Sequence, residues 1–152
     1  MKLAEALIRR ADSQKRFEQL KARLLLNAKI QEGDLPAEAP ADLLAELGRV
    51  GNELLELIRR INKTNSATVF QTNETLSDAL ASRDLLALQR SVYAELAQSA
   101  TITQGRYMRS EVKFVPTINV AETQKRADEL ARTYRELDAR IQELNWQTEL
   151  VG

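Results

Sequence analysis

The sequence predicts an all-α protein, an antiparallel four-helix bundle made from two helical hairpins in tandem, with a short β element between helices three and four. Three observations predict this class. Among 152 residues there are only 5 Gly and 3 Pro, while helix-favouring Leu, Ala, Glu and Arg are abundant. Apolar residues recur at alternating steps of three and four. A mixed polar and apolar pattern from the first half also returns in the second half, in the same order.

The internal repeat relates residues 3–68 to residues 76–148. The pattern Leu57-x-x-Arg60-Ile61-x-x-x-Asn65-x-x-Thr68 recurs as Leu137-x-x-Arg140-Ile141-x-x-x-Asn145-x-x-Thr148. Upstream, Leu3-Ala4-Glu5-Ala6-Leu7-x-x-Arg10 recurs as Leu76-Ser77-Asp78-Ala79-Leu80-x-x-Arg83. Since 152 residues are enough for one hydrophobic core without metal or disulfides, we expect a single domain over residues 1–152.

The first hairpin is predicted from two apolar stripes and the proline-containing segment between them. A helix is expected from about residue 3 to about residue 30, because Gly33 fits a left-handed helix stop and Pro36 forbids continuation. Pro40 suits the first turn of a second helix, with Asp42 at the positive end of its dipole. This helix is expected to continue towards Thr68.

The second hairpin follows a short polar connection at residues 71–74. Thr75 and Asp78 form a capping-box pattern for a third helix that runs to about Ala100, and Asn119 and Glu122 form another for the fourth helix. The fourth helix has apolar residues at heptad spacing. The third helix carries a second apolar face, which predicts burial inside the bundle or contact with another subunit. That face consists of Leu85, Leu88, Val92 and Leu96.

Residues 106–115 are the one stretch with strand character, rich in aromatic and β-branched residues and ended by Pro116. The tip of the first hairpin has nothing like it. Because a lone strand leaves backbone amides unpaired, we expect this segment to pair with its copy in a neighbouring subunit. The predicted oligomer contacts are Arg106, Tyr107, Arg109, Ser110, Glu111, Lys113 and Phe114.

Composition excludes several kinds of chemistry. The chain has neither Cys nor His, which removes thiolates, disulfides, the usual general base and the commonest zinc ligands. We therefore predict no catalytic residue, no metal site and no cofactor, and we expect the protein not to be an enzyme. Lys plus Arg equals Asp plus Glu at 22 each, so no net field attracts nucleic acid, and we expect no nucleic-acid partner.

The repeated polar residues allow two interpretations. As buried polar groups they would fix the register and pairing of the helices, as core Asn does in coiled coils. Alternatively, the arginines and amides at the end of the bundle that carries the termini would hold a small anionic ligand. The residues of this ligand site are Arg60, Asn65, Arg140, Asn145 and Trp146. Trp146 has no counterpart in the first half, where Ser66 stands.

The N-terminal residues enter an amphipathic pattern at once and lack the apolar region of a signal peptide. No stretch has the uninterrupted apolar length that spans a bilayer. We therefore expect a cytoplasmic protein without stable membrane association. Self-association through the third helix and residues 106–115 is its predicted role, so we expect a homo-oligomer.

Four motifs taken together resemble a family of small bacterial helical proteins, mostly of unknown function and sometimes labelled septicolysin. The motifs are Met1-Lys-Leu-Ala-Glu-Ala-Leu7, Arg59-Arg-Ile-Asn-Lys-Thr-Asn65, Arg106-Tyr-x-Arg-Ser-Glu-x-Lys113 and Glu143-Leu-Asn-Trp146. The resemblance covers nearly the whole chain and implies a helical bundle without an established activity. The septicolysin label implies a membrane-damaging toxin, a weaker alternative that only a refolding amphipathic hairpin would support.

Overall fold

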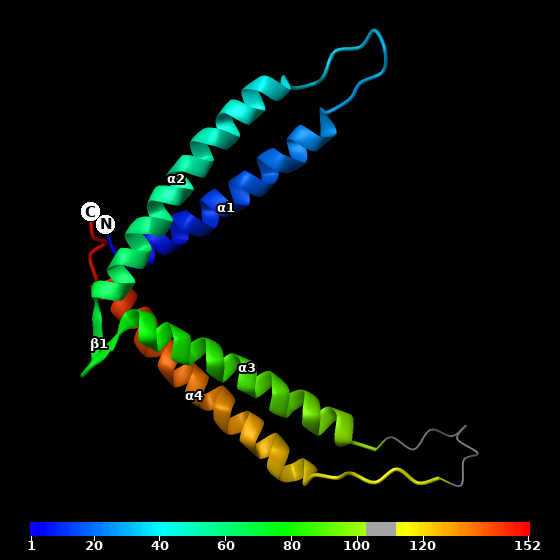
Figure 1. The fold of residues 1–152 in the computed structure, drawn as a ribbon, viewed down its shortest axis with the longest axis vertical. Helices are drawn as coiled ribbons and strands as arrows, with labels where there is room; N and C mark the ends of the chain where they lie inside the picture. The colour runs from blue at the N-terminus through cyan, green and yellow to red at the C-terminus, as the bar shows by residue number, and fades with distance from the viewer. Residues whose placement is uncertain (103–111) are drawn as a thin grey trace. The chain divides into compact units, whose positions relative to one another are not determined.

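The computed structural model describes residues 1–102 and 112–152 (Figure 1). Its four helices are α1 (Leu3–Leu26), α2 (Pro40–Ala67), α3 (Leu76–Ala100) and α4 (Val120–Gln147). Two short strands, β1 (Val69–Gln71) and β2 (Glu74–Thr75), lie between α2 and α3 and form an antiparallel sheet. The predicted all-α class with two tandem helical hairpins is confirmed.

Three of the helices begin at the residues that the sequence predicts, at a proline or a capping side chain. Pro40 is the first residue of α2, where its fixed φ suits the first turn. The carboxylate of Asp78 accepts a hydrogen bond from the backbone amide of Thr75 at 2.8 Å, and Thr75 Oγ1 accepts one from the Asp78 amide at 3.3 Å. Asn119 Oδ1 accepts a hydrogen bond from the Glu122 amide at 3.0 Å. These caps satisfy backbone donors that a helix start leaves unpaired.

Helix α1 ends at Leu26, a few residues before the predicted end near residue 30. The side chain of Asn27 accounts for this earlier stop. Its amide nitrogen donates to the carbonyl oxygen of Arg23 at 2.9 Å, and its Oδ1 accepts from the backbone amide of Glu38 at 3.1 Å. Because these bonds tie the helix end to the residues before α2, the chain leaves the helix there.

The described chain divides into two compact units. The first unit contains residues 1–69 and 143–152, and the second unit contains residues 70–142. The units do not coincide with the sequence repeats, since the last residues of the second repeat belong to the first unit. The single domain over residues 1–152 stays a prediction.

The first unit contains the antiparallel hairpin of α1 and α2, which pack along each other (Figure 1). Leu20, Leu43 and Val50 form its buried cluster, with Phe17, Leu24 and Leu47 packed against them. Nearer the chain ends, Leu3, Ala6 and Ile61 are fully buried. The apolar stripe predicted for each helix therefore faces the partner helix.

The second unit contains α3 and most of α4. Its buried positions include three small residues, Ala79, Ala97 and Ala127, beside Leu76, Leu130 and Ile141. Arg83 Nη1 donates to Asp138 Oδ1 at 2.7 Å and joins the two helices. The pairing of α3 with α4 thus combines small buried side chains with a half-buried ion pair.

The strands lie where the sequence predicts only a polar connection. Asn73 has a φ of 60°, a left-handed conformation that Asn tolerates in tight turns, and this lets residues 69–75 form a hairpin. Of the segment with predicted strand character, residues 112–115 are described and have no regular secondary structure. Its residues 106–111 lie outside the described residues.

Candidate functional site

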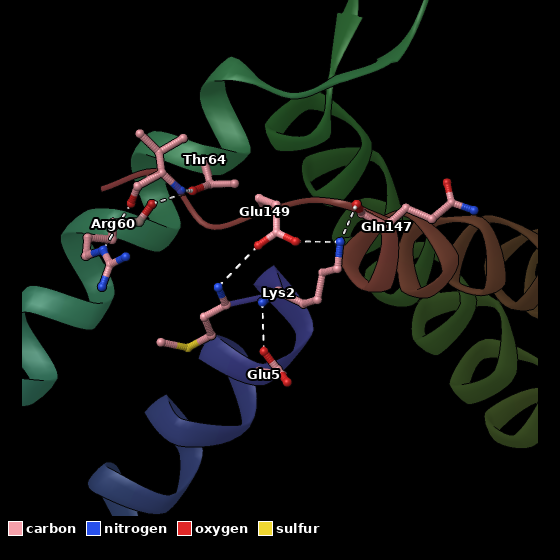
Figure 2. A network of polar contacts seen from close by, with 8 residues as sticks. Lys2, Glu5, Arg60, Thr64, Gln147 and Glu149 are labelled. Carbon is pink, nitrogen blue, oxygen red and sulfur yellow. Dashed lines mark hydrogen bonds and ion pairs between the residues drawn. The ribbon is translucent and has the colours of Figure 1, made fainter.

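A polar network joins the start of α1 to the residues that follow α4 in the first unit (Figure 2). The backbone amide of Leu3 donates to the carbonyl oxygen of Thr148 at 2.9 Å. Lys2 and Glu149 form an isolated antiparallel bridge, and Lys2 Nζ lies 2.6 Å from Glu149 Oε1. We call this network, with the α2 residues that extend it, the terminal clasp.

Two residues of α2 complete the terminal clasp. Thr64 is fully buried, and its Oγ1 accepts a hydrogen bond from the Val151 amide at 3.0 Å while donating to the Arg60 carbonyl oxygen at 2.8 Å. Arg60 Nε donates to the carbonyl oxygen of Val151 at 3.0 Å (Figure 2). Side chains of α2 therefore satisfy both backbone polar groups of Val151, as buried polar groups require.

Arg140, the counterpart of Arg60, makes a related contact in the second unit. Its guanidinium lies 4.5 Å from the centre of the Phe70 ring, and Nη2 donates to Gln71 Oε1 at 3.3 Å. The repeat aligns Arg60 with Arg140 by a shift of 80 (140 − 60), and the same shift aligns Gln71 with Val151. Each arginine thus contacts the segment that leaves the last helix of the other repeat.

The remaining residues of the predicted ligand site differ in burial. Asn145 is buried, Asn65 is half-buried, and Trp146 is 54% exposed. Arg60, Asn65, Asn145 and Trp146 belong to the first unit, whereas Arg140 belongs to the second. Arg60 donates to the Val151 carbonyl oxygen and Arg140 donates to the Gln71 side chain. These contacts favour the interpretation in which the repeated polar residues stabilise the fold. Binding of an anion stays a prediction.

The predicted oligomer contacts fall largely outside the described residues, as Arg106, Tyr107, Arg109, Ser110 and Glu111 do. Lys113 and Phe114 are described and exposed. Phe114 also lines an apolar groove of about 510 Å³ at the end of α3, together with Leu96, Ile102 and Ile118.

The second apolar face predicted for the third helix is exposed rather than buried. The exposed fractions of Leu85, Leu88, Val92 and Leu96 are 54%, 67%, 61% and 42%. Steps of three and four place these side chains on one side of α3. We call these four residues the α3 apolar face.

The corresponding face of α1 is polar. The repeat aligns Leu3 with Leu76 by a shift of 73 (76 − 3), which pairs the α3 apolar face with Asp12, Lys15, Gln19 and Arg23. These four residues are exposed as well. Since α1 pairs with α2 although these four positions are polar, the α3 apolar face is not a requirement of hairpin packing. Contiguous exposed aliphatic residues mark interaction surfaces.

Ion pairs and caps, rather than a cleft, account for the shifted carboxyl pKa values. Hydrogen bonds from Lys2 and from the N-terminal amine hold the pKa of Glu149 below its usual range. Hydrogen bonds from Arg23 and Arg16 lower the pKa of Glu38 and Glu46. The amide and hydroxyl of Thr75 lower the pKa of Asp78. Three of these carboxylates join separate parts of the first unit, and Asp78 caps the start of α3.

Sequence reasoning missed Lys2 and Glu149 of the terminal clasp, because the recognised repeat ended at Thr148. A local pattern is present at the start of α1. Lys2 and Glu5 stand where Thr75 and Asp78 form their capping box, and the Lys2 amide donates to Glu5 Oε2 at 2.8 Å. That pattern marks the start of a helix and does not indicate the bridge to Glu149.

The described part of the chain offers neither a membrane span nor a metal cluster. None of its helices is both long enough and apolar enough to cross a bilayer. Within residues 1–102 and 112–152, no three Asp or Glu side chains are placed to hold a metal ion.

The described residues form a helical protein of two hairpins, in which α3 has an exposed apolar face. The chain belongs to a family of unknown function (DUF6847), whose model matches residues 10–150. It is similar to a protein from Corynebacterium diphtheriae, solved as the "crystal structure of a functionally unknown conserved protein", with 50% identity and a TM-score of 0.93 over 99% of each chain. No curated protein matches it.

These matches confirm the predicted resemblance to helical proteins of unknown function. Neither match carries the septicolysin label, which therefore has no support from them.

Proposed function

We propose that the protein is a non-enzymatic helical module that self-associates through the α3 apolar face. The observation that carries this proposal is the contrast between the two hairpins. Four aliphatic residues stand exposed on α3, where the corresponding positions of α1 are Asp, Lys, Gln and Arg. Burial of these side chains against a partner would contribute about 0.8 kcal/mol of binding free energy for each CH₂ group removed from water.

The proposed partner is a second copy of the same chain. The α3 apolar face is aliphatic throughout, so two copies are complementary to each other, as a two-fold interface requires. The chain carries 22 basic and 22 acidic residues, so no net charge drives two copies apart.

The available area extends beyond the helix. A stable interface buries about 800 Å² on each partner, more than four aliphatic side chains supply. Leu96 belongs both to the α3 apolar face and to the groove of about 510 Å³ that follows α3. Ile102, Phe114 and Val115 near this groove are 46%, 68% and 75% exposed. Together they continue the apolar surface past the end of the helix.

Light scattering on the full chain tests the proposal. The wild type is expected to have the mass of a dimer or a larger assembly, and the double variant Leu88→Lys, Val92→Gln is expected to have a lower mass. These substitutions introduce the residues of α1 at the corresponding positions. The matched control Lys15→Glu, Gln19→Glu on α1 is expected to keep the wild-type mass. A monomeric wild type, or a double variant with unchanged mass, would contradict self-association through α3.

The contribution of residues 106–115 is tested separately. Removal of residues 107–115 is expected to lower the mass if this segment joins the interface. An unchanged mass would confine the interface to α3 and refute the predicted contacts from Arg106 to Phe114.

Neither alternative function is proposed. The residues of the anionic-ligand hypothesis are not proposed as one site, because Arg60 belongs to the first unit and Arg140 to the second. The membrane-toxin hypothesis depends on the septicolysin label alone.

A further inference from the structure

A groove of about 600 Å³ lies along the first hairpin and is lined from both α1 and α2. Arg9 and Asp12 contribute from α1, and Glu53, Glu56 and Arg60 contribute from α2. The volume falls within the range of small-molecule sites, about 300–1,000 Å³. The charged side chains of both signs distinguish this groove from the apolar groove at the end of α3.

Farther from the chain ends, facing charges of the same hairpin pair with each other. Arg16 forms an ion pair with Glu46, and Arg23 forms one with Glu38. Arg9 and Glu53 stand one heptad nearer the chain ends than Arg16 and Glu46 (16 − 7 and 46 + 7). No ion pair within 4.0 Å joins these two among the described residues. The heptad spacing would allow a third ion pair between Arg9 and Glu53, but the groove lies between these two side chains instead.

The second hairpin shows that these charges are not needed for helix pairing. The positions that correspond to Arg9, Asp12 and Glu53 are Ser82, Leu85 and Thr133. Helices α3 and α4 pair without any of the three charges. Arg9, Asp12 and Glu53 of the first hairpin are therefore free to serve a ligand.

We propose that this groove binds a free basic amino acid. Arg9 and Arg60 are donors suited to a carboxylate, since guanidinium groups recognise carboxylates through paired hydrogen bonds. Asp12, Glu53 and Glu56 accept hydrogen bonds from the ammonium and the basic side chain. Three carboxylates and two guanidinium groups line the groove with a charge of −1 (−3 + 2). Met1 also lines it, but its N-terminal ammonium is already paired with Glu149 Oε2 at 3.2 Å. The excess carboxylate favours a ligand with one excess positive charge.

Arg60 would serve both the terminal clasp and the groove. Its Nε holds the carbonyl oxygen of Val151, which fixes the orientation of the guanidinium. A donor held in place before the ligand arrives costs less conformational entropy on binding.

Titration calorimetry on the full chain, with free L-arginine as the probe, tests this proposal. Saturable binding with one site per chain is expected. Agmatine lacks the carboxylate and Nα-acetylarginine lacks the free ammonium, so each is expected to bind roughly tenfold more weakly, the effect of one lost charged hydrogen bond. Absence of saturable binding at millimolar arginine, or equal binding of agmatine and arginine, would overturn the proposal.

Variants locate the site on the first hairpin. Glu53→Gln and Arg9→Met are each expected to weaken binding of arginine roughly tenfold, with melting temperatures showing that both variants fold. The matched control Glu136→Gln changes the counterpart of Glu56 in the second hairpin and is expected to bind as the wild type does. Unchanged binding by Glu53→Gln, or equal loss in the control, would refute a site in this groove.

Discussion

The two hairpins share buried positions and present different surfaces. The same three positions of the repeat are fully buried in both, as Leu3, Ala6 and Ile61 in the first and as Leu76, Ala79 and Ile141 in the second. On the exposed face, four polar residues of α1 correspond to four aliphatic residues of α3. The shared positions are those that a hairpin needs in order to pair its helices. The positions that differ are where each hairpin is free to acquire a role of its own.

The hairpins also differ in their buried polar contacts. Thr64 binds Val151 in the first unit, whereas its counterpart in the repeat is Leu144. Arg83 and its counterpart Arg10 each have a buried Nε without a hydrogen-bond partner, but among the described residues Arg83 alone of the two forms an ion pair, through Nη1 with Asp138. A common apolar framework thus tolerates different polar contacts around it.

The largest effect is expected from substitutions at the buried isoleucines, which test whether corresponding buried positions contribute equally to the stability of both hairpins. Ile61→Ala and Ile141→Ala are each expected to lower the free energy of unfolding by about 3 kcal/mol, because each removes a fully buried side chain and leaves a cavity. Urea denaturation measures both. The control Ile8→Ala removes a side chain that is 53% exposed, so it should cost much less. A large loss for one isoleucine and a negligible loss for the other would break the equivalence.

Thr64→Val tests the polar contact that only the first unit has. We expect a loss of about 2 kcal/mol, because the substitution keeps the volume but leaves the Val151 amide without its acceptor. Hydrogen exchange at Val151 should become faster. In the control Thr68→Val, the lost hydroxyl donates only to the Thr64 carbonyl oxygen one turn earlier, so a small change is expected. Unaltered exchange at Val151 would show that Thr64 does not hold the clasp.

Elements that depend on local chemistry could be predicted from the sequence. Pro40, the Thr75–Asp78 pair and Asn119 mark helix starts through contacts with residues at most three positions away. The apolar face of α3 was also visible as a period in the sequence. Its exposure was not, since an apolar stripe fits a buried helix and a subunit contact equally well.

Elements that depend on distant partners could not be predicted. The bridge between Lys2 and Glu149 joins residues 147 positions apart (149 − 2), and no local pattern signals it. The strands of residues 69–75 are short and lack the Asn-Gly or Asp-Gly turn that signals a hairpin. Residues 106–115 have stronger strand propensity, yet propensity in strands depends on neighbours that sequence alone does not supply.

Asp138→Asn tests the ion pair that distinguishes the second hairpin. Arg83 and Asp138 have side chains that are 22% and 33% exposed and lie 2.7 Å apart, so water screens part of their attraction. We expect a loss of about 1 kcal/mol in urea denaturation. Arg10→Met removes the counterpart arginine, for which no ion pair is found among the described residues, and should cost less. A greater loss for Arg10→Met would reveal a partner for Arg10 and remove this difference between the hairpins.

The two hairpins are expected to differ least in their loss of stability at low pH, because exposed ion pairs contribute little to stability. Glu38, Glu46 and Glu149 of the first unit have a lowered pKa, as does Asp78 of the second. A carboxylate whose pKa is lower in the folded state stabilises the fold when the pH is above its unfolded-state pKa, which is about 4.3 for Glu and about 3.9 for Asp. That stabilisation is lost as the pH falls from there through the lowered folded-state pKa.

Hydrogen exchange measured between pH 6 and pH 3 is therefore expected to show a larger loss of protection in α1 and α2 than in α3, after correction for the intrinsic exchange rate. Glu46→Gln and Glu149→Gln should reduce the pH dependence in the first unit, because Gln cannot titrate. The same substitution at Glu136 should leave it unchanged. Greater acid sensitivity in α3 than in α1 would mean that the carboxylates paired with Arg16, Arg23 and Lys2 do not control the response, and that the hairpins differ in acid for another reason.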